Sequence, residues 1–192
     1  MKKVAITGAN GLIGNVLRQG LKEEYHLTLL DKNPEILKRI NGYRLDLSRE
    51  YFKFSRVVSE HDLIVHLAWN TQLENIGSEK IDLNNSLMFY YVYSAAVQRK
   101  IPRVVMASSV HADDFSDWRD GLLSPDRNPT PDSPYGSSKI FMEALGRYYA
   151  KKSGLEVVCL RFGAVLRDEK KRSEERGYEK IWLSHRDCVD LV

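Results

Sequence analysis

Three glycines at a spacing of three residues follow the first apolar run of this chain, and they constrain its fold more than any other feature. The run at residues 4–7 is typical of a β-strand, and apolar periodicity over residues 12–22 predicts a helix directly after it. Gly8 suits a tight turn, and Gly11 allows the backbone to approach a pyrophosphate closely. Gly14 allows the helix to pack closely against the strand. The pattern alone also fits a simple turn.

The rest of the chain repeats this alternation of strand and helix. Apolar runs at residues 27–30, 43–45, 63–67, 103–107 and 156–160 predict further strands, and residues 34–40, 48–58, 81–99 and 135–152 have helical character. Strands that read as continuous apolar runs between helices indicate a parallel sheet covered on both faces. We therefore expect an α/β protein with a doubly wound parallel sheet, the Rossmann fold.

An acidic residue ends the second run at the position that dinucleotide binding requires. Asp31 lies 20 residues after Gly11, where a carboxylate accepts hydrogen bonds from the hydroxyls of the adenosine ribose. The same carboxylate repels a 2′-phosphate, so it favours NAD over NADP, and the neighbouring Lys32 weakens that preference. Asp31 also suits a turn or helix-capping role.

Tyr135 and Lys139 share one face of a helix, because they are four residues apart. An ammonium group stabilises a nearby phenolate, and such a tyrosine can take a proton from a substrate hydroxyl. Tyr148 and Lys152 repeat the spacing in the same helix. The two tyrosines lie about 20 Å apart along the axis. We assign the catalytic role to Tyr135, at the strand-end side, and a packing or interface role to Tyr148.

The fifth run ends in two serines and a histidine, at the sheet edge where ligands bind in open α/β sheets. Ser109 suits a hydrogen bond to the reacting oxygen, and it also suits an ordinary strand-end serine. His111 suits a contact with substrate or a purely structural role.

Composition excludes several other classes of protein. Hydrophobic residues make up 43% of the chain, charged residues make up 29%, and the net charge is only +3, which argues against a disordered chain and against a nucleic-acid partner. The two cysteines form no CxxC pair, so we expect neither a disulfide nor a metal site. The sequence has no run long enough to span a membrane. Because the first predicted strand begins at residue 4, we expect no signal peptide. We expect a cytoplasmic protein without a membrane partner.

Three segments indicate contacts beyond the sheet. The segment 81–99 is apolar nearly all round, so we expect a homodimer through the 81–99 and 135–152 helices, or else cover from the same subunit. The long loop at residues 112–133 predicts a functional role. The heavily charged segment 167–180 is typical of a solvated loop, although one or two of its cations suit a substrate phosphate or carboxylate.

The ordered set of these motifs resembles the short-chain dehydrogenase/reductase superfamily, in its extended branch, the NAD-dependent epimerase/dehydratase family. The motifs are Gly8-x-x-Gly11-x-x-Gly14, Asp31, Asp46-Leu47, His66-Leu67-Ala68, Asn85, Ser109, Tyr135-x-x-x-Lys139 and Arg161-Phe162-Gly163. The resemblance implies a catalytic set of Ser109, Tyr135 and Lys139, with Asn85 supporting a proton-relay water. It implies cofactor contacts from Gly8, Asn10, Gly11, Leu12, Ile13, Gly14, Asp31, Lys32, Asp46, Leu47, Leu67, Ala68, Trp69, Tyr135, Lys139 and Phe162.

Within that family the chain looks like the uronate dehydrogenase group and related NAD-dependent sugar dehydrogenases, on the motifs Ser108-Ser109-x-His111 and residues 182–187. Ala164 stands where the uronate enzymes carry a serine, which puts recognition of a carboxylate in doubt. The resemblance further implies a domain at residues 1–165 that binds NAD and, at residues 166–192, the start of an incomplete substrate-binding lobe, because family members continue past Val192.

The sequence thus predicts an NAD-dependent oxidoreductase that moves a hydride from a sugar hydroxyl (a uronate, aldose or sugar phosphate) to NAD, with Tyr135 as the base and Ser109 and His111 on the substrate. One alternative is a nucleotide-sugar 4-epimerase or dehydratase that uses the same residues. A second alternative is a non-catalytic NAD-binding module.

Overall fold

One six-stranded parallel sheet forms the centre of the computed structural model, which describes residues 1–39, 41–114, 124, 127–169 and 181–192. The strands are β1 (Lys3–Thr7), β2 (His26–Asp31), β3 (Gly42–Arg44), β4 (Leu63–His66), β5 (Arg103–Ser109) and β6 (Glu156–Phe162). Their spatial order is β3-β2-β1-β4-β5-β6, and every neighbouring pair is parallel. The strand order reverses between β1 and β4, so a ligand crevice is expected at their carboxyl ends. The predicted Rossmann fold is confirmed.

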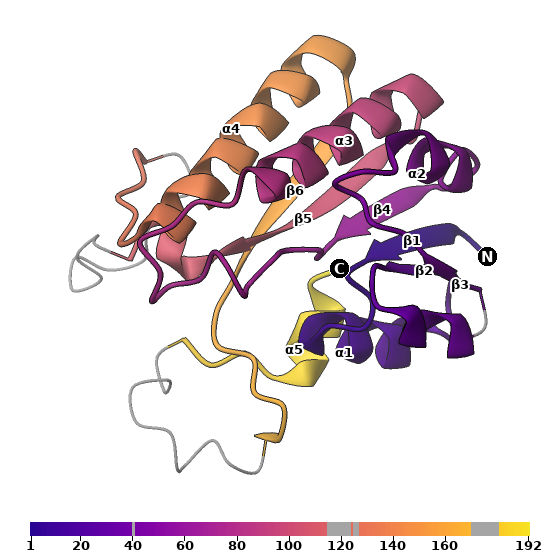
Figure 1. Cartoon of the computed structure of the whole chain (residues 1–192), viewed down its shortest axis with the longest axis horizontal. Helices are drawn as coiled ribbons and strands as arrows, with labels where there is room; N and C mark the ends of the chain where they lie inside the picture. Colours follow the sequence, from indigo (N-terminus) through magenta and orange to yellow (C-terminus); the bar gives the residue numbers. More distant parts are fainter. Residues whose placement is uncertain (40, 115–123, 125–126, 170–180) are drawn as a thin grey trace.

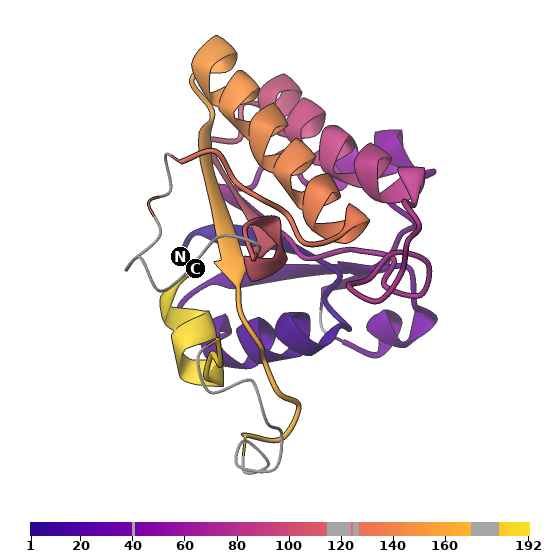
Figure 2. The ribbon, with the colours of Figure 1, turned by 90° about the vertical axis from the view of Figure 1, so that its left-hand side faces the viewer.

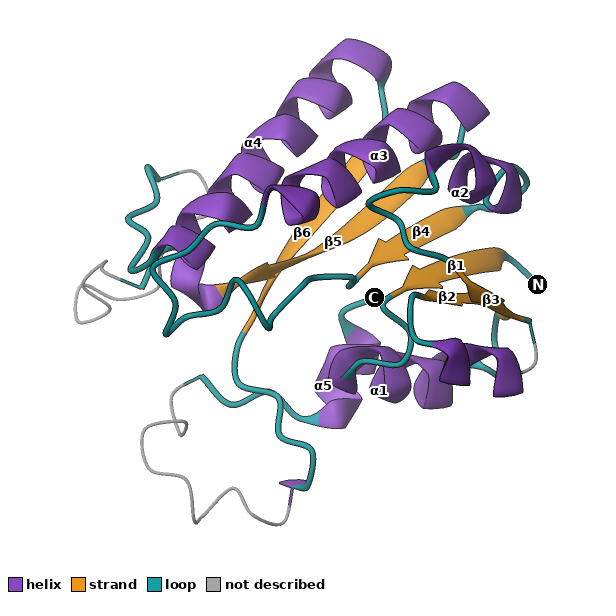
Figure 3. Ribbon diagram, in the orientation of Figure 1, coloured by secondary structure: helices purple, strands orange, loops and turns teal. Residues whose placement is uncertain are grey.

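Helices cover both faces of this sheet (Figures 1 and 3). They are α1 (Leu12–Leu21), α2 (Tyr51–Val57), α3 (Leu83–Arg99), α4 (Pro134–Ser153) and α5 (His185–Asp190), with 3₁₀ turns η1 (Pro34–Lys38) and η2 (Val110–Ala112). In Figure 2, α3 and α4 run side by side over one face, whereas α1 and α5 lie on the other. The architecture therefore has three layers.

The core consists of one apolar cluster on each face of the sheet. Ile64 of β4 packs with α3 residues such as Phe89, and its neighbour Val65 packs on the other side with Leu17 of α1. Successive side chains of a strand point to opposite faces. An apolar residue at every position is therefore what a doubly covered strand needs, which explains the continuous runs in the sequence.

Element boundaries differ from the predictions where side chains or pairing decide them. The predicted 34–40 helix is the short 3₁₀ turn η1, and α3 starts at Leu83 rather than residue 81 because the Asp82 side chain caps it by accepting from Asn84 N. β5 extends past residue 107 to Ser109, since pairing with β6 continues as far as Phe162. Ser108 and the predicted catalytic Ser109 are therefore both strand residues.

The carboxyl-terminal part of the chain packs against the Rossmann unit. Cys188 of α5 is fully buried, and Val189 lies against Gly20 of α1, where an added Cβ would come within 2.3 Å of the valine side chain. The assignment of residues 166–192 to a substrate-binding lobe stays a prediction. Cys159 and Cys188 are both free thiols. Among the described residues, no helix has the length and apolar character to cross a membrane.

Candidate active site

The turn after β1 has the close backbone contacts that its glycines predicted. Gly8 adopts a φ of +71°, and a Cβ on it would lie 2.7 Å from Ala68 N. A Cβ on Gly14 would lie 2.5 Å from Gly8 O, so the first turn of α1 packs directly on the turn. These contacts bring the start of α1 next to the end of β4, and any side chain at either position would open the turn.

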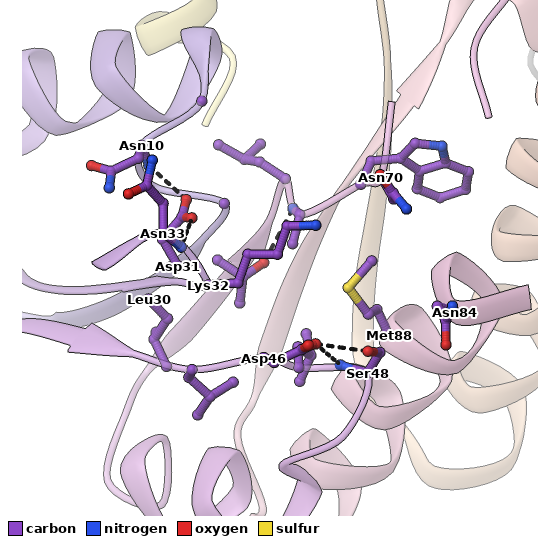
Figure 4. Close-up of a pocket in the computed structure, with 18 of the residues that line it drawn as sticks. Asn10, Leu30, Asp31, Lys32, Asn33, Asp46, Ser48, Asn70, Asn84 and Met88 are labelled. Carbon is purple, nitrogen blue, oxygen red and sulfur yellow. Dashed lines mark hydrogen bonds between the residues drawn. The ribbon is translucent and has the colours of Figure 1, made fainter. Parts of the chain in front are cut away.

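A cavity of about 610 Å³ opens at this edge of the sheet, between the ends of β1, β2 and β4 (Figure 4). Most of the predicted cofactor contacts line it, namely Gly8, Asn10, Gly11, Asp31, Lys32, Asp46, Leu47, Leu67, Ala68 and Trp69. Its other polar lining residues, which were not predicted from the sequence, are Thr7, Asn33, Ser48, Arg49, Asn70, Thr71, Gln72 and Asn84. Segments far apart in the sequence therefore meet around one cavity, and the predicted contacts with the cofactor stay predictions.

Asp31 lies at the end of β2 with its carboxylate held in place (Figure 4). Its Oδ2 accepts from Asn10 N at 2.9 Å, and its Oδ1 accepts from Asn33 N at 2.9 Å. Each carboxylate oxygen can accept more than one hydrogen bond. Asp31 therefore keeps acceptor capacity for a vicinal diol while joining the glycine turn to the segment after β2.

Asp46 lies at the far end of the cavity and is tied down locally, because its Oδ1 accepts from Ser48 N and Ser48 Oγ (Figure 4). Leu47, beside it, is buried. The cavity thus combines a glycine cradle, a helix amino-terminus, an oriented carboxylate and an apolar wall. These features fit a dinucleotide.

Six of the predicted cofactor contacts lie outside this cavity lining, namely Leu12, Ile13, Gly14, Tyr135, Lys139 and Phe162. Leu12 lines a neighbouring cavity of about 630 Å³ between α1 and α5. Ile13 packs against the apolar cluster under α1, and Gly14 serves the helix-to-turn contact. Phe162, at the end of β6, is a buried member of the same cluster. The predicted contact of Phe162 with a nicotinamide stays a prediction.

Tyr135 stands in the first turn of α4, where the sequence placed it. Ser133 caps the helix by accepting from Gly136 N at 3.1 Å, and a Cβ on Gly136 would lie 2.0 Å from His111 O. This contact brings the tyrosine to the end of β5 beside Ser109, which is buried. Burial raises the pKa of Tyr135, the Ser109 hydroxyl lowers it, and the charges of Glu74 and Asp132 raise it.

Lys139 is buried on the same face of α4, and its ammonium is held by two groups. Nζ donates to Ala107 O at 2.7 Å and lies 3.5 Å from the centre of the Trp69 ring, against 5.4 Å to the Tyr135 ring. Burial lowers the pKa of Lys139 to about 7. The net direction of the pKa of Tyr135 is therefore upward, in contrast to the lowering expected from Lys139.

Asn85 is buried in the first turn of α3, in a polar network that the sequence reasoning missed. Its Oδ1 accepts from Asn70 N at 2.7 Å, and its Nδ2 donates to Glu74 Oε2 at 2.8 Å. Both ends of the side chain are engaged, so its predicted support of a proton-relay water stays untested. Glu74 lacked any recognisable signal, because nothing in the local sequence marks an acid between Leu73 and Asn75 as buried.

His111 has a structural partner and also faces the candidate base. Its Nδ1 lies 2.5 Å from Asp132 Oδ2, and its ring stands edge-on to Tyr135 with centroids 6.2 Å apart. The pair joins the two ends of the loop at residues 112–133, parts of which (residues 115–123 and 125–126) lie outside the described residues. Both interpretations of His111 therefore remain open.

The second tyrosine–lysine pair lies at the other end of α4, away from the cavity. Tyr148 is 50% exposed, and Lys152 Nζ lies 5.5 Å from its ring. The spacing therefore repeats without the burial that gives Lys139 its special environment. The proposed anion-binding role of the charged segment 167–180 falls mostly on residues 170–180, outside the described part of the chain.

A buried ionic network supports the strand ends behind the site. Ser108 Oγ donates to Glu143 Oε1 at 2.5 Å, and Arg161 of β6 donates to both oxygens of Glu143, at 3.0 and 2.9 Å. Arg161 also reaches Asp113 at 3.4 Å. Because these contacts join β5, β6, α4 and the loop after η2, they fix the carboxyl end of β5 relative to the start of α4.

A sequence profile described as the NAD dependent epimerase/dehydratase family matches residues 4–179. The chain belongs to this family. Curated relatives include an L-arabinose 1-dehydrogenase (NAD(P)(+)) from Haloferax volcanii, 32% identical over 98% of this chain and 80% of the relative. A uronate dehydrogenase from Agrobacterium fabrum is 32% identical over 100% of this chain and 71% of the relative.

Solved structures agree with this membership. Two structures of uronate dehydrogenase from Agrobacterium tumefaciens, one of them a mutant complexed with NAD, superpose with a TM-score of 0.82 at 31% identity, over 100% of this chain and 70% of theirs. The predicted family, the predicted class of NAD-dependent oxidoreductase or epimerase and the NAD cofactor are confirmed. The residue assignments above rest on the geometry of this chain.

Proposed function

We propose that this protein is an NAD-dependent dehydrogenase of a free or phosphorylated sugar, with Tyr135 as its base. The observation that carries the proposal is the meeting of Ser109, Tyr135 and Lys139 beside Trp69, which lines the cavity that fits a dinucleotide. Relatives that act on L-arabinose, uronates and glucose 6-phosphate support a sugar substrate.

In the proposed reaction, Ser109 and Tyr135 bind the reacting hydroxyl of the sugar. The Tyr135 phenolate takes the hydroxyl proton, and the carbon–oxygen bond becomes a carbonyl. NAD, when bound, would supply the acceptor for the hydride that the same carbon gives up. Lys139 supplies the positive charge beside the phenolate, and the fixed Asp31 carboxylate binds the adenosine ribose. Because Asp31 repels a 2′-phosphate, we propose a preference for NAD over NADP.

The test is NADH formation by the purified protein with NAD and a panel of aldoses, uronates and sugar phosphates. We expect turnover with one class, its loss in Tyr135→Phe, and its retention in Tyr148→Phe, the matched control from the same helix. Unchanged turnover in Tyr135→Phe would refute the assignment. If the protein binds NAD but forms no NADH with any sugar of the panel, the result would favour the alternatives, a nucleotide-sugar 4-epimerase or a non-catalytic NAD-binding module.

We further propose that the protein is a cytoplasmic homodimer that pairs through α3 and α4. The outer faces of these helices expose several large apolar side chains, including Leu83 at 73%, Phe141 at 53% and Tyr148 at 50%. An apolar patch of this kind is typical of an interface. Light scattering is expected to give a dimer mass for the protein and a monomer mass for Phe141→Glu; a monomer in both would refute the pairing.

A further inference from the structure

Glu74 is a fully buried carboxylate in the segment between β4 and α3, and the proposed reaction has not used it. Its exposed fraction is 0%, although the apolar neighbours Leu73 and Ile76 are 50% and 57% exposed. This is the reverse of the usual arrangement, in which the acid faces water and the apolar side chains face the core. Burying a charged group is costly unless it has partners, so the contacts of Glu74 indicate what it does.

The partners of Glu74 lie at the start of α3. Its Oε2 accepts from Asp82 N at 3.0 Å and from Asn85 Nδ2 at 2.8 Å, while its Oε1 accepts no hydrogen bond from any described residue. Glu74 also forms no salt bridge within the described part of the chain. Its carboxylate is therefore bound by neutral donors alone within the described part of the chain.

A continuous set of contacts leads from Glu74 to the ammonium of Lys139. Because Asn85 Nδ2 donates to Glu74, its Oδ1 faces Asn70 N and accepts from it at 2.7 Å. Asn70 follows Trp69 in the chain, and the Trp69 ring lies 3.5 Å from Lys139 Nζ. Glu74 thus orients an amide that fixes the backbone carrying the ring against which the ammonium rests.

The charge of Glu74 also acts on Lys139 and Tyr135 through the protein interior. The titratable groups that interact electrostatically with Lys139 are Glu74, from the segment before α3, Glu143 and Tyr135 of α4, Cys159 of β6 and His66 of β4.

Near neutral pH, most of these groups are either neutral or paired with an opposite charge. Arg161 pairs with Glu143 through both carboxylate oxygens. Burial raises the pKa of Cys159 to about 11 and lowers the pKa of His66 to about 3, so both are neutral. Among the groups that act on Lys139, Glu74 is therefore the carboxylate whose hydrogen bonds come from neutral donors and that forms no ion pair with a described cation.

We propose that Glu74 is a positioning residue for Lys139: its carboxylate orients the Trp69–Asn70 backbone beneath the ammonium, and its charge keeps that ammonium protonated. The importance of Glu74 for catalysis rests on the proposed function, because Lys139 supports the base Tyr135 only in that reaction. The effect of Glu74 on the pKa of Lys139 does not require substrate, so it is measurable in the free protein.

The first test is a pH titration of Trp69 fluorescence in the free protein. The Trp69 signal is isolated by subtraction of a Trp69→Phe variant, because the chain has three tryptophans. We expect a transition with a midpoint near the Lys139 pKa of about 7, absent in Lys139→Met. In Glu74→Gln, which keeps the shape and the acceptor oxygen, the midpoint is expected to fall by about one pH unit.

The matched control is Glu79→Gln, which removes an exposed carboxylate of the same segment and is expected to leave the midpoint unchanged. A Glu74→Gln midpoint equal to that of the parent protein would overturn the proposal. The titration requires no turnover, so a protein inactive on every sugar would refute the proposed function while a shifted midpoint still supported the role of Glu74.

A double-mutant cycle covers the case in which Glu74→Gln folds poorly. If Glu74 stabilises the Lys139 charge, then Glu74→Gln is expected to lower the thermal midpoint less in a Lys139→Met background than in the parent protein, and the double variant is expected to fold. An equal loss in both backgrounds, or a double variant that also fails to fold, would show that Glu74 has only a structural role and would overturn the proposal.

Discussion

The substitution Lys139→Met is expected to stabilise the protein near neutral pH while abolishing its activity. Lys139 is 4% exposed, and burial lowers its pKa from 10.5 to about 7. The unfolded chain therefore binds this proton more tightly than the folded chain does. One unit of pKa is about 1.4 kcal/mol, so the charged lysine costs the folded state about 4 kcal/mol near pH 7.

Methionine fills nearly the same space without that cost, but it loses the hydrogen bond to Ala107 O. Leaving a carbonyl unpaired costs about 1–3 kcal/mol. The net gain expected for Lys139→Met is therefore about 1–3 kcal/mol near pH 7. As the pH rises from about 7 toward 10.5, the unfolded state loses its proton too, and the stability of the parent protein rises. By about pH 9 the advantage of methionine is expected to shrink by about 2 kcal/mol.

The assay is urea unfolding of both proteins at about pH 7 and about pH 9, followed by circular dichroism, with NADH formation measured in parallel. Lys152→Met is the matched control, because Lys152 also lies on α4 and also follows a tyrosine, Tyr148, by four residues. Unlike Lys139, it is exposed to solvent. It is expected to change stability by less than about 0.5 kcal/mol at either pH. A Lys139→Met variant whose stability difference does not vary with pH would refute the reasoning.

Three further outcomes test the site. In Tyr135→Phe, turnover is expected to fall by at least about 100-fold with NAD affinity nearly unchanged, measured by steady-state kinetics and calorimetry; an equal loss of NAD affinity would contradict a purely catalytic role. Asp31→Ser is expected to weaken NAD binding and to narrow the preference for NAD over NADP, and a preserved ratio of the two Kd values would count against Asp31 as the ribose ligand. Gly8→Ala is expected to lower stability by more than about 1 kcal/mol, because the added Cβ meets Ala68 N at a φ of +71°; an unchanged Tm would show that the turn relaxes.

The lining of the candidate cofactor cavity was largely predictable because its determinants are short-range. A glycine turn between a strand and a helix fixes where phosphates can approach, and the sheet order then brings Asp31 and Ala68 to the same edge. Strand runs buried on both faces are equally local signals. The spacing of Tyr135 and Lys139 was local too, but helix position, rather than spacing, separated it from the repeat at Tyr148.

The environment of Lys139 was not predictable in the same way. Its contact with Trp69 joins α4 to the segment after β4, and the burial of Glu74 depends on how that segment folds over α3. Nothing in a sequence window around residue 74 distinguishes a buried acid from a solvated one, since the difference arises from donors supplied by Asp82 and Asn85. Long-range electrostatics of this kind appears only when the elements are in place.

Burial alone drives the two central groups of the site toward their neutral forms. It raises the pKa of Tyr135 and lowers the pKa of Lys139 to about 7, whereas proton abstraction requires a phenolate beside an ammonium. The pH range in which Lys139 is charged therefore ends close to neutrality, while phenolate formation becomes easier as the pH rises. In the proposal, the carboxylate of Glu74 extends the pH range in which Lys139 is charged to higher pH. This widens the pH range in which a charged Lys139 and a Tyr135 phenolate coexist, although the same carboxylate also raises the pKa of Tyr135. Because Lys139 carries the charge on which the phenolate depends, Glu74→Gln is expected to move the alkaline limb of kcat to lower pH and not merely to reduce its height.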